Sequence, residues 1–203
     1  MENQQTFLAD LVCTRISHDL IGNIGAISAV LELATDNNKC ILDSDTYNIL
    51  ASAAETLKIR QKFFRIAFGV NSTNISTNEL QQLGSDYLNT LSNRAAKLDF
   101  ECNNCSAELA KIICLCIMIG AEVCIKGGHI SIHINGEKLI ITTQTDYKLA
   151  MTKIENYHKI ITGQNDIENA SQFVQLIYLR ALLGIDVPFV LNNDENKMTL
   201  IIG

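Results

Sequence analysis

Apolar residues recur every three or four positions near the start of the chain, at the spacing of one face of an amphipathic helix. They are Leu8, Val12, Ile16, Leu20, Ile24, Ile27, Leu31 and Ala34. This pattern predicts a helix from about residue 4 to 35. A second helix is predicted to start after the capping candidates Asp43 and Ser44 and to end at Gly69. Its apolar stripe, interrupted by Gln61, contains Leu50, Ala53 or Ala54, Leu57, Phe64 and Phe68.

Two long helices joined by a short connection form an antiparallel hairpin. Such a hairpin cannot bury both of its faces alone, and pairing with a second copy would give a four-helix bundle. The sequence therefore predicts a symmetric homodimer. The polar stretch at 71–77 predicts a boundary between this helical hairpin domain, 1–70, and a second domain, 71–203.

The second domain is predicted to mix helices and strands. Ser76 and Glu79 form a possible capping box that opens a helix to about residue 94. The later apolar patterns predict a strand at 97–102, a buried helix at 106–124, strands at 129–134 and 138–144 joined by a turn at Asn135-Gly136, helices near 147–161 and 168–183, and strands near 187–192 and 197–202. The order α-β-α-β-β-α-α-β-β favours an α+β sandwich with helices on one face of a sheet.

Composition narrows the class of protein. The 203 residues suffice for one ordinary domain or two small ones, and a net charge of −6 argues against a nucleic-acid partner. We find no run of 18 apolar residues and no signal-peptide pattern, so we expect a soluble, cytoplasmic protein that does not enter the membrane. The seven cysteines lie among apolar positions and are expected to be small buried hydrophobes in a reducing compartment.

His18 stands out within the first helix. At about 100° per residue it lies roughly 200° around the helix from Ile16 and so points away from the apolar stripe. Arg15 lies one turn before it on the same face, and Gly22 and Gly25 lie one and two turns after it. A glycine within a helix costs about 1 kcal/mol relative to alanine, so bare backbone beside an imidazole indicates a histidine presented to a partner.

An exposed imidazole nitrogen can accept a phosphoryl group from an aspartyl phosphate and pass it on. Arg15 could balance the charge of that group, and Asp19 could orient or polarise the ring. The alternative is an ordinary surface histidine. The second helix carries a basic stripe that is either a solvated face or a docking site for an acidic partner, made of Lys58, Lys62 and Arg65.

Two further motifs carry weaker signals. Cys102 and Cys105 are spaced as in zinc sites, but His129 and His133 lie in a predicted strand and a second such cysteine pair is missing. We therefore expect no metal site. The pair Gly127-Gly128 is expected to form a helix-to-strand turn.

The segment Arg15-Ile16-Ser17-His18-Asp19-Leu20, followed by Gly25-Ala26-Ile27 and Leu31-Glu32-Leu33, resembles the phospho-acceptor helix of the ChpT-type histidine phosphotransferases of alphaproteobacteria. Lys62–Gly69 resembles the end of that family's hairpin, and Glu168–Gly184 resembles its C-terminal helix. The resemblance covers most of the chain and is most specific over 11–33 and 60–69. The chain departs from the family pattern at Gly22-Asn23, where the family has a Ser-Pro pair.

This resemblance implies a homodimer whose hairpins form a bundle like the dimerisation domain of sensor kinases. It also implies a second domain like a degenerate form of the kinases' ATP-binding domain. Kinases carry an asparagine in the helix before the Gly-Gly turn, and Ala107–Lys126 has none. Residues 142–147 also lack the glycines of the Asp-x-Gly-x-Gly motif that kinases have after the hairpin. We therefore expect no nucleotide-binding residues and no ATP-dependent kinase activity.

The resemblance implies a phosphotransferase of a two-component phosphorelay. A receiver domain of a hybrid sensor kinase would donate a phosphoryl group to His18, which would pass it to the receiver domains of response regulators that control the cell cycle. The chain would need no cofactor of its own, with Mg²⁺ held by the partner receiver domain. The docking surface would comprise Gly22, Asn23, Gly25, Lys58, Lys62 and Arg65. Two alternatives remain open: a dimeric scaffold that binds response regulators without phosphotransfer, and an autophosphorylating kinase, which the missing motifs disfavour.

Overall fold

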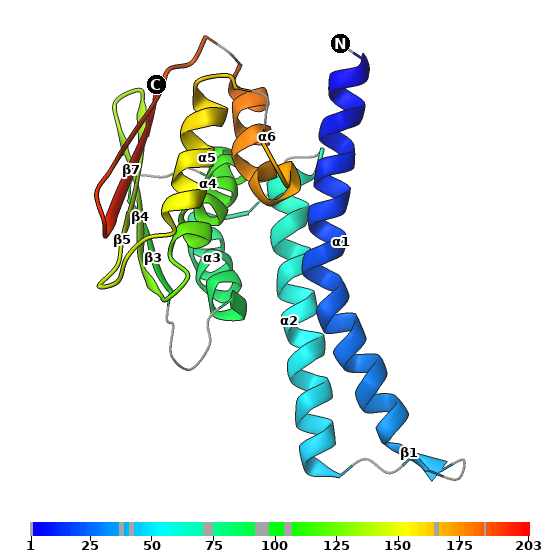
Figure 1. The fold of residues 1–203 in the computed structure, drawn as a ribbon. Coiled ribbons are helices and arrows are strands. Elements are labelled where there is room, and N and C mark those ends of the chain that lie inside the picture. Colours follow the sequence, from blue (N-terminus) through cyan, green and yellow to red (C-terminus); the bar gives the residue numbers. More distant parts are fainter. Residues whose placement is uncertain are drawn as a thin grey trace.

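The computed structural model describes residues 2–36, 39–40, 43–70, 75–91, 98–103, 107–164, 167–184 and 186–203. Its first two helices, α1 (Glu2–Leu33) and α2 (Ser44–Phe68), form an antiparallel hairpin, as the sequence predicts (Figure 1). The connection between them includes two short strands that the sequence did not indicate, β1 (Thr35–Asp36) and β2 (Lys39–Cys40). Asp43 caps α2, because its carboxylate accepts the backbone N–H of Thr46 at 2.7 Å.

The remaining elements follow the predicted order. They are α3 (Thr77–Leu91), β3 (Leu98–Asn103), α4 (Ala110–Val123), β4 (Gly128–Asn135), β5 (Lys138–Gln144), α5 (Met151–Ile161), α6 (Val174–Leu183), β6 (Phe189–Asn193) and β7 (Lys197–Ile202), with short 3-10 helices at Ala107–Leu109 and Ala170–Phe173. The capping box is confirmed, since Ser76 and Glu79 exchange side-chain to backbone hydrogen bonds at the start of α3.

Two predicted helices begin later than expected. The prediction that α5 begins near residue 147 is wrong, because the backbone before it pairs with the β6–β7 turn instead. The N–H groups of Thr145 and Leu149 donate to carbonyls of Asn196 and Glu195. The helix predicted from 168 begins as a 3-10 turn, because Asn169 adopts a left-handed conformation with φ of 55°.

The five-stranded sheet has the order β3-β4-β5-β7-β6. β3 pairs with β4 in parallel, and the other neighbours are antiparallel. The predicted turn between β4 and β5 is confirmed, with Gly136 at a φ of 62°. Helices α3 to α6 form a layer between the sheet and the hairpin, so one face of the sheet is covered by helices (Figure 1). The α+β sandwich predicted from the sequence is therefore confirmed.

The core of this sandwich extends into the end of α2. Phe63, Phe64, Ile66 and Ala67 are buried within the same apolar cluster as the helices and strands of the second domain. The ring of Phe63 stacks on that of Tyr87 in α3, with centroids 3.7 Å apart and planes 6° from parallel. The domain boundary at 71 stays a prediction, and residues 71–74 lie outside the described part of the chain, but the apolar core crosses it.

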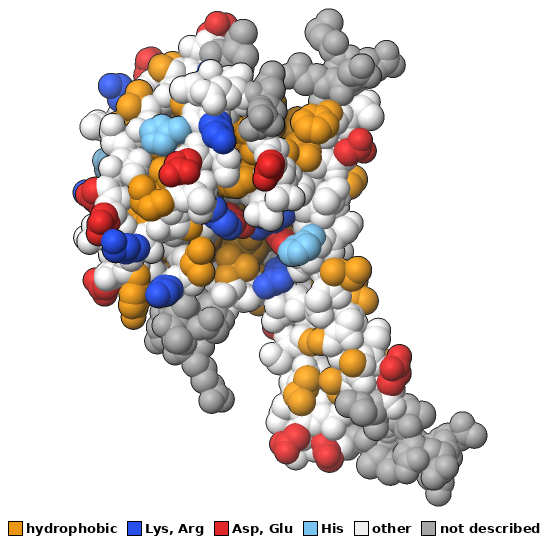
Figure 2. Space-filling model, in the orientation of Figure 1, with side chains coloured by type: hydrophobic (Ala, Val, Ile, Leu, Met, Phe, Trp, Pro, Cys, Tyr) orange, Lys and Arg blue, Asp and Glu red, His pale blue; other side chains and the backbone are white. Residues whose placement is uncertain are grey.

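The other end of the hairpin has a different character. It carries large apolar side chains at exposed positions on both of its helices, namely Ile21, Ile24, Leu31, Tyr47 and Ile49. Figure 2 shows hydrophobic side chains spread over this part of the surface. The predicted stripe of α1 is therefore covered only in part by this single chain.

Truncating Phe63 tests whether the core is shared. We expect Phe63→Ala to lower the free energy of unfolding by about 3–5 kcal/mol, because it removes a buried ring that stacks on Tyr87. Urea titrations followed by far-ultraviolet circular dichroism and by tyrosine fluorescence should give one coincident transition. Phe7→Ala, at a half-exposed position of α1, should change the free energy by less than about 0.5 kcal/mol. Two separate transitions would show that the hairpin folds independently.

Candidate functional site

His18 projects from α1 into solvent, with 84% of its side chain exposed. Ile16 and Leu20, on either side of it in sequence, are partly buried against the core. The predicted orientation of the imidazole is therefore confirmed. The backbone on the same face is open, since a Cβ placed on Gly22 or Gly25 would meet no atom within 4 Å. Another molecule can thus approach the ring closely.

Asp19 holds one side of the imidazole. Its Oδ1 lies 3.2 Å from Nδ1 of His18. Because an ionised carboxylate only accepts hydrogen bonds, this contact assigns a proton to Nδ1 and leaves the lone pair on Nε2. In that tautomer the free lone pair lies on the ring nitrogen away from Asp19. The orienting role of Asp19 stays a prediction.

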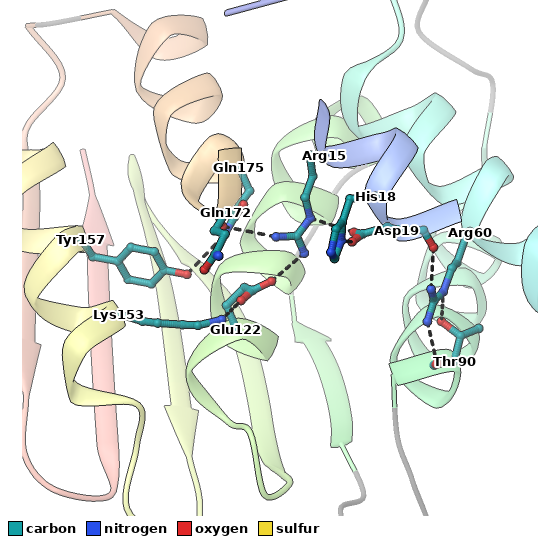
Figure 3. A network of polar contacts seen from close by, with 10 residues as sticks. All are labelled: Arg15, His18, Asp19, Arg60, Thr90, Glu122, Lys153, Tyr157, Gln172 and Gln175. Carbon is teal, nitrogen blue, oxygen red and sulfur yellow. Dashed lines mark hydrogen bonds and ion pairs between the residues drawn. The ribbon is translucent and has the colours of Figure 1, made fainter. Parts of the chain in front are cut away.

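A chain of ion pairs runs from this aspartate into the helical layer (Figure 3). Oδ2 of Asp19 accepts from Nε of Arg15 at 2.7 Å, and Nη2 of Arg15 donates to Oε1 of Glu122 on α4 at 2.6 Å. The other oxygen of Glu122 accepts from Nζ of Lys153 on α5. The guanidinium predicted to balance a phosphoryl charge is thus engaged by two carboxylates, and only 12% of the Arg15 side chain is exposed.

Each charged group in this series of ion pairs stabilises the ionised form of its neighbour. Burial by itself lowers the pKa of Arg15, but the carboxylates of Glu122 and Asp19 outweigh that effect and raise the pKa above its ordinary value. Burial raises the pKa of Glu122, but the charges of Arg15 and Lys153 outweigh it, and the net pKa is lowered. Arg15 and Glu122 therefore both remain ionised at neutral pH.

Arg60 on α2 is a site residue that sequence reasoning missed. Its guanidinium donates to the backbone oxygen of Asp19 at 2.7 Å and to both oxygens of Thr90 on α3, at 3.1 Å to the hydroxyl and 2.9 Å to the carbonyl. Arg60 thereby links α1, α2 and α3 at the turn of α1 that carries His18. The sequence indicates this role only weakly. Arg60 differs from Lys58 and Lys62 only in lying on another face of the helix than the basic stripe.

The predicted basic stripe lies on the surface of α2. Lys58, Lys62 and Arg65 are all exposed. Lys58 pairs with Glu55 at 3.1 Å, in a contact where both side chains are largely solvated. In the described part of the chain, the ion-pair network beside His18 contains none of these three residues. Their role in docking stays a prediction.

A cavity of about 200 Å³ lies beside the ion-pair chain. Its walls combine charged groups with apolar side chains, and are formed by Arg15, Tyr87, Leu91, Leu98, Met118, Ala121, Glu122, Cys124, Ile125 and Lys153. Figure 2 shows a hollow lined by hydrophobic side chains, with Lys and Arg side chains near its edges.

Asn23 lies at the position where the chain departs from the family pattern. Within the described residues its buried side-chain Nδ2 has no hydrogen-bond partner, and α1 continues through it unbroken.

The glycine pair and the cysteines were the weaker signals in the sequence. Gly127 follows α4 in a tight turn, with φ of 93°, so the helix-to-strand turn is confirmed. Within the described residues, no group of three or more metal-binding side chains occurs, and Cys105 lies outside them. Three of the four cysteines described as free are buried, namely Cys114, Cys116 and Cys124, whereas Cys13 is exposed.

Comparisons with known proteins agree with the resemblance read from the sequence. No family model matches the chain. Protein phosphotransferase ChpT of Brucella abortus (strain 2308) is 29% identical over 136 residues, which span 64% of this chain and 61% of that protein. A solved structure described as a bacterial phosphotransferase has a TM-score of 0.73 and 23% identity, over 98% of this chain and 96% of that one, and so shares its fold. The histidine kinase AdeS of Acinetobacter baumannii is less similar, with a TM-score of 0.47 and 11% identity over 91% of this chain and 95% of that one.

The hydrogen bonds of Arg60 yield a testable prediction. Arg60→Met keeps most of the aliphatic volume but removes the donor to the part-buried oxygens of Asp19 and Thr90. We expect a loss of about 2–3 kcal/mol in the free energy of unfolding, measured by urea titration. Arg65→Met is the matched control on the same helix and should be nearly neutral, because Arg65 is exposed. Equal stability of the two variants would show that the Arg60 contacts contribute nothing.

Proposed function

We propose that this protein is a histidine phosphotransferase that relays a phosphoryl group through His18 in a two-component phosphorelay. The observation that carries the proposal is an exposed imidazole whose Nδ1 is held by Asp19, leaving Nε2 as a free nucleophile. The similarity to the Brucella phosphotransferase supports it, although the aligned segment spans only 61% of that protein's length. The donor would be the receiver domain of a hybrid sensor kinase, and the acceptors would be receiver domains of response regulators, including regulators of the cell cycle.

The chemistry follows from the two ring nitrogens. The Nε2 lone pair attacks the phosphorus of an aspartyl phosphate, so that a P–N bond forms while the bond to the carboxylate oxygen breaks. The aspartate leaves with that electron pair. Nδ1 keeps its proton, and Asp19 stabilises the positive charge that develops on the ring. Transfer to an acceptor aspartate is the same step in reverse.

The docking surface we propose lies along α1 beside His18. The open backbone at Gly22 and Gly25 lets a receiver domain bring its aspartate within bonding reach of Nε2. Such a domain would carry its own carboxylates, and the Mg²⁺ they hold would offset the phosphoryl charge. Acidic side chains near that centre would complement the basic stripe of Lys58, Lys62 and Arg65.

We also propose a homodimer built on the far end of the hairpin. Large exposed apolar side chains on both helices support this, among them Leu31 at 45% and Tyr47 at 63% exposure. Pairing with a second copy would cover them in a four-helix bundle. The two copies would then present their His18 side chains on the outside of that bundle.

We propose that the protein lacks ATP-dependent kinase activity, because Ala107–Lys126 contains no asparagine. Gly120 lies in the segment that corresponds to the asparagine-bearing helix of kinases. A Cβ there would come within 2.9 Å of Oγ1 of Thr143 and 3.0 Å of Ile130, so a larger side chain does not fit. Phosphate would reach His18 from a receiver domain rather than from a bound nucleotide.

We propose that the protein acts in the cytoplasm. Among the described helices, none has the length and apolar character to cross a membrane.

His18→Gln tests the proposed function directly. We expect wild-type protein to take radiolabel from a phosphorylated receiver domain, and the variant to take none. Circular dichroism and light scattering should be unchanged, because the imidazole is exposed and does not support the fold. His133→Gln, at an exposed position on the sheet, is the matched control and should accept label normally. Label on His18→Gln would refute the assignment, and a wild-type protein that binds the receiver without label would favour the scaffold alternative.

Gly22→Leu tests where the partner approaches. The leucine favours the helix but fills the open space beside His18, so transfer should slow about tenfold or more through loss of docking. Stopped-time assays over a range of receiver concentrations measure this rate. Ala181→Leu adds a leucine to an exposed position of α6 and should have no effect. An unchanged rate in Gly22→Leu would place the docking surface elsewhere.

A further inference from the structure

We propose that Glu122 of α4 is a positioning residue for His18, acting from the second domain through Arg15 and Asp19. This inference rests on the proposed function. Glu122 does not touch the imidazole. It is connected to it by three successive contacts, of 2.6 Å to Arg15, 2.7 Å from Arg15 to Asp19, and 3.2 Å from Asp19 to Nδ1 of His18 (Figure 3).

Arg15 sets the conformation of the Asp19 side chain. Asp19 directly follows His18, and neighbouring residues on a helix point in directions about 100° apart. The Nδ1 contact therefore depends on the conformation of the aspartate side chain. Arg15, one turn earlier, fixes that conformation by binding the second carboxylate oxygen.

Glu122 in turn holds the Arg15 side chain in place. Arg15 has a long, flexible side chain that would otherwise move in solvent. Its guanidinium is held at the junction by Oε1 of Glu122 and by the backbone oxygen of Gln172 at 3.3 Å. Of these two acceptors only Glu122 is charged, and only 14% of its side chain is exposed. Glu122 therefore supplies the strongest anchor of Arg15 outside α1.

Asp19, Arg15, Glu122 and Lys153 alternate in sign, so each buried charge has an opposite neighbour. The lowered pKa of Glu122 keeps its charge at neutral pH. Glutamine at this position would keep the shape but lose the charge that holds Arg15. The arginine would then be free to leave Asp19.

This chain sets which ring nitrogen carries the proton. With Asp19 held in place, the proton stays on Nδ1 and the Nε2 lone pair points outward. When Asp19 is released, a share of the molecules carries the proton on Nε2. In that tautomer the lone pair lies on Nδ1, and the outward-facing Nε2 has none with which to attack phosphorus. The rate of phosphate acceptance should fall with the population of the reactive tautomer.

The experiment compares wild type with Glu122→Gln, using the full chain labelled with ¹⁵N. Long-range ¹H–¹⁵N correlation spectra of the His18 ring report the tautomer directly. We expect the wild type to carry its proton on Nδ1 and the variant to gain the Nε2-protonated form. The maximal rate of label transfer from a phosphorylated receiver should fall about tenfold, with the receiver concentration for half-maximal rate unchanged, because orientation rather than docking is affected.

Glu195→Gln is the matched control. It removes a carboxylate from a surface ion pair with Lys148, whose atoms lie 3.2 Å apart, and should change neither tautomer nor rate. Glu122→Asp keeps the charge but is shorter by one methylene, and should give a smaller shift in the same direction. If the glutamine variant does not fold, Glu122→Asp provides the test instead.

The outcomes separate the two proposals. Absence of label on wild-type His18 would overturn the proposed function, and with it the role of Glu122. Normal labelling of the wild type, together with an unchanged tautomer and rate in the Glu122 variants, would overturn this inference alone. In that case the ion pairs would serve only to fasten α1 to α4.

Discussion

Charges removed from water must be paired, and this requirement organises the junction between the hairpin and the helical layer. Arg15 is nearly buried and meets two carboxylates from different helices, while Lys153 neutralises the second of them. Removing one member of such a set leaves an uncompensated buried charge, which is usually far costlier than the net gain from the intact pair. The chain of ion pairs therefore fixes the position of α1 against α4 more firmly than a surface contact would. His18 lies at its solvent end.

Apolar packing acts at the same junction. The Phe63 ring stacks on Tyr87, and Arg60 ties α2 to α1 and α3 one layer away. The end of the hairpin near the sheet is thus held by ring stacking, hydrogen bonds and ion pairs, whereas the opposite end exposes apolar side chains such as Leu31 and Ile49. One molecule therefore has one end built into its own core and another end available for a second copy. The turn of α1 that carries His18 lies between the two.

Most helices and strands could be predicted from the sequence, because residues close together in the chain determine them. Helix periodicity placed α1 and α2 and turned His18 outward, and side-chain capping fixed the starts of α2 and α3. The contacts that define the site were not predictable in the same way. Glu122 and Lys153 lie more than a hundred residues from Arg15 along the chain, and nothing local marks them as its partners. The late start of α5 has a similar cause, since its preceding backbone pairs with the β6–β7 turn.

The core that crosses from α2 into α3 has a consequence for recognition. Two parts of a chain move relative to each other unless the contact between them is large and apolar. Here Phe63 is fully buried at that contact, so the hairpin and the helical layer present one preformed surface. Binding of a partner to this surface would therefore cost little free energy for ordering the residues of this protein. Discrimination among competing partners would then come from the shape and charge of that surface rather than from an induced closure.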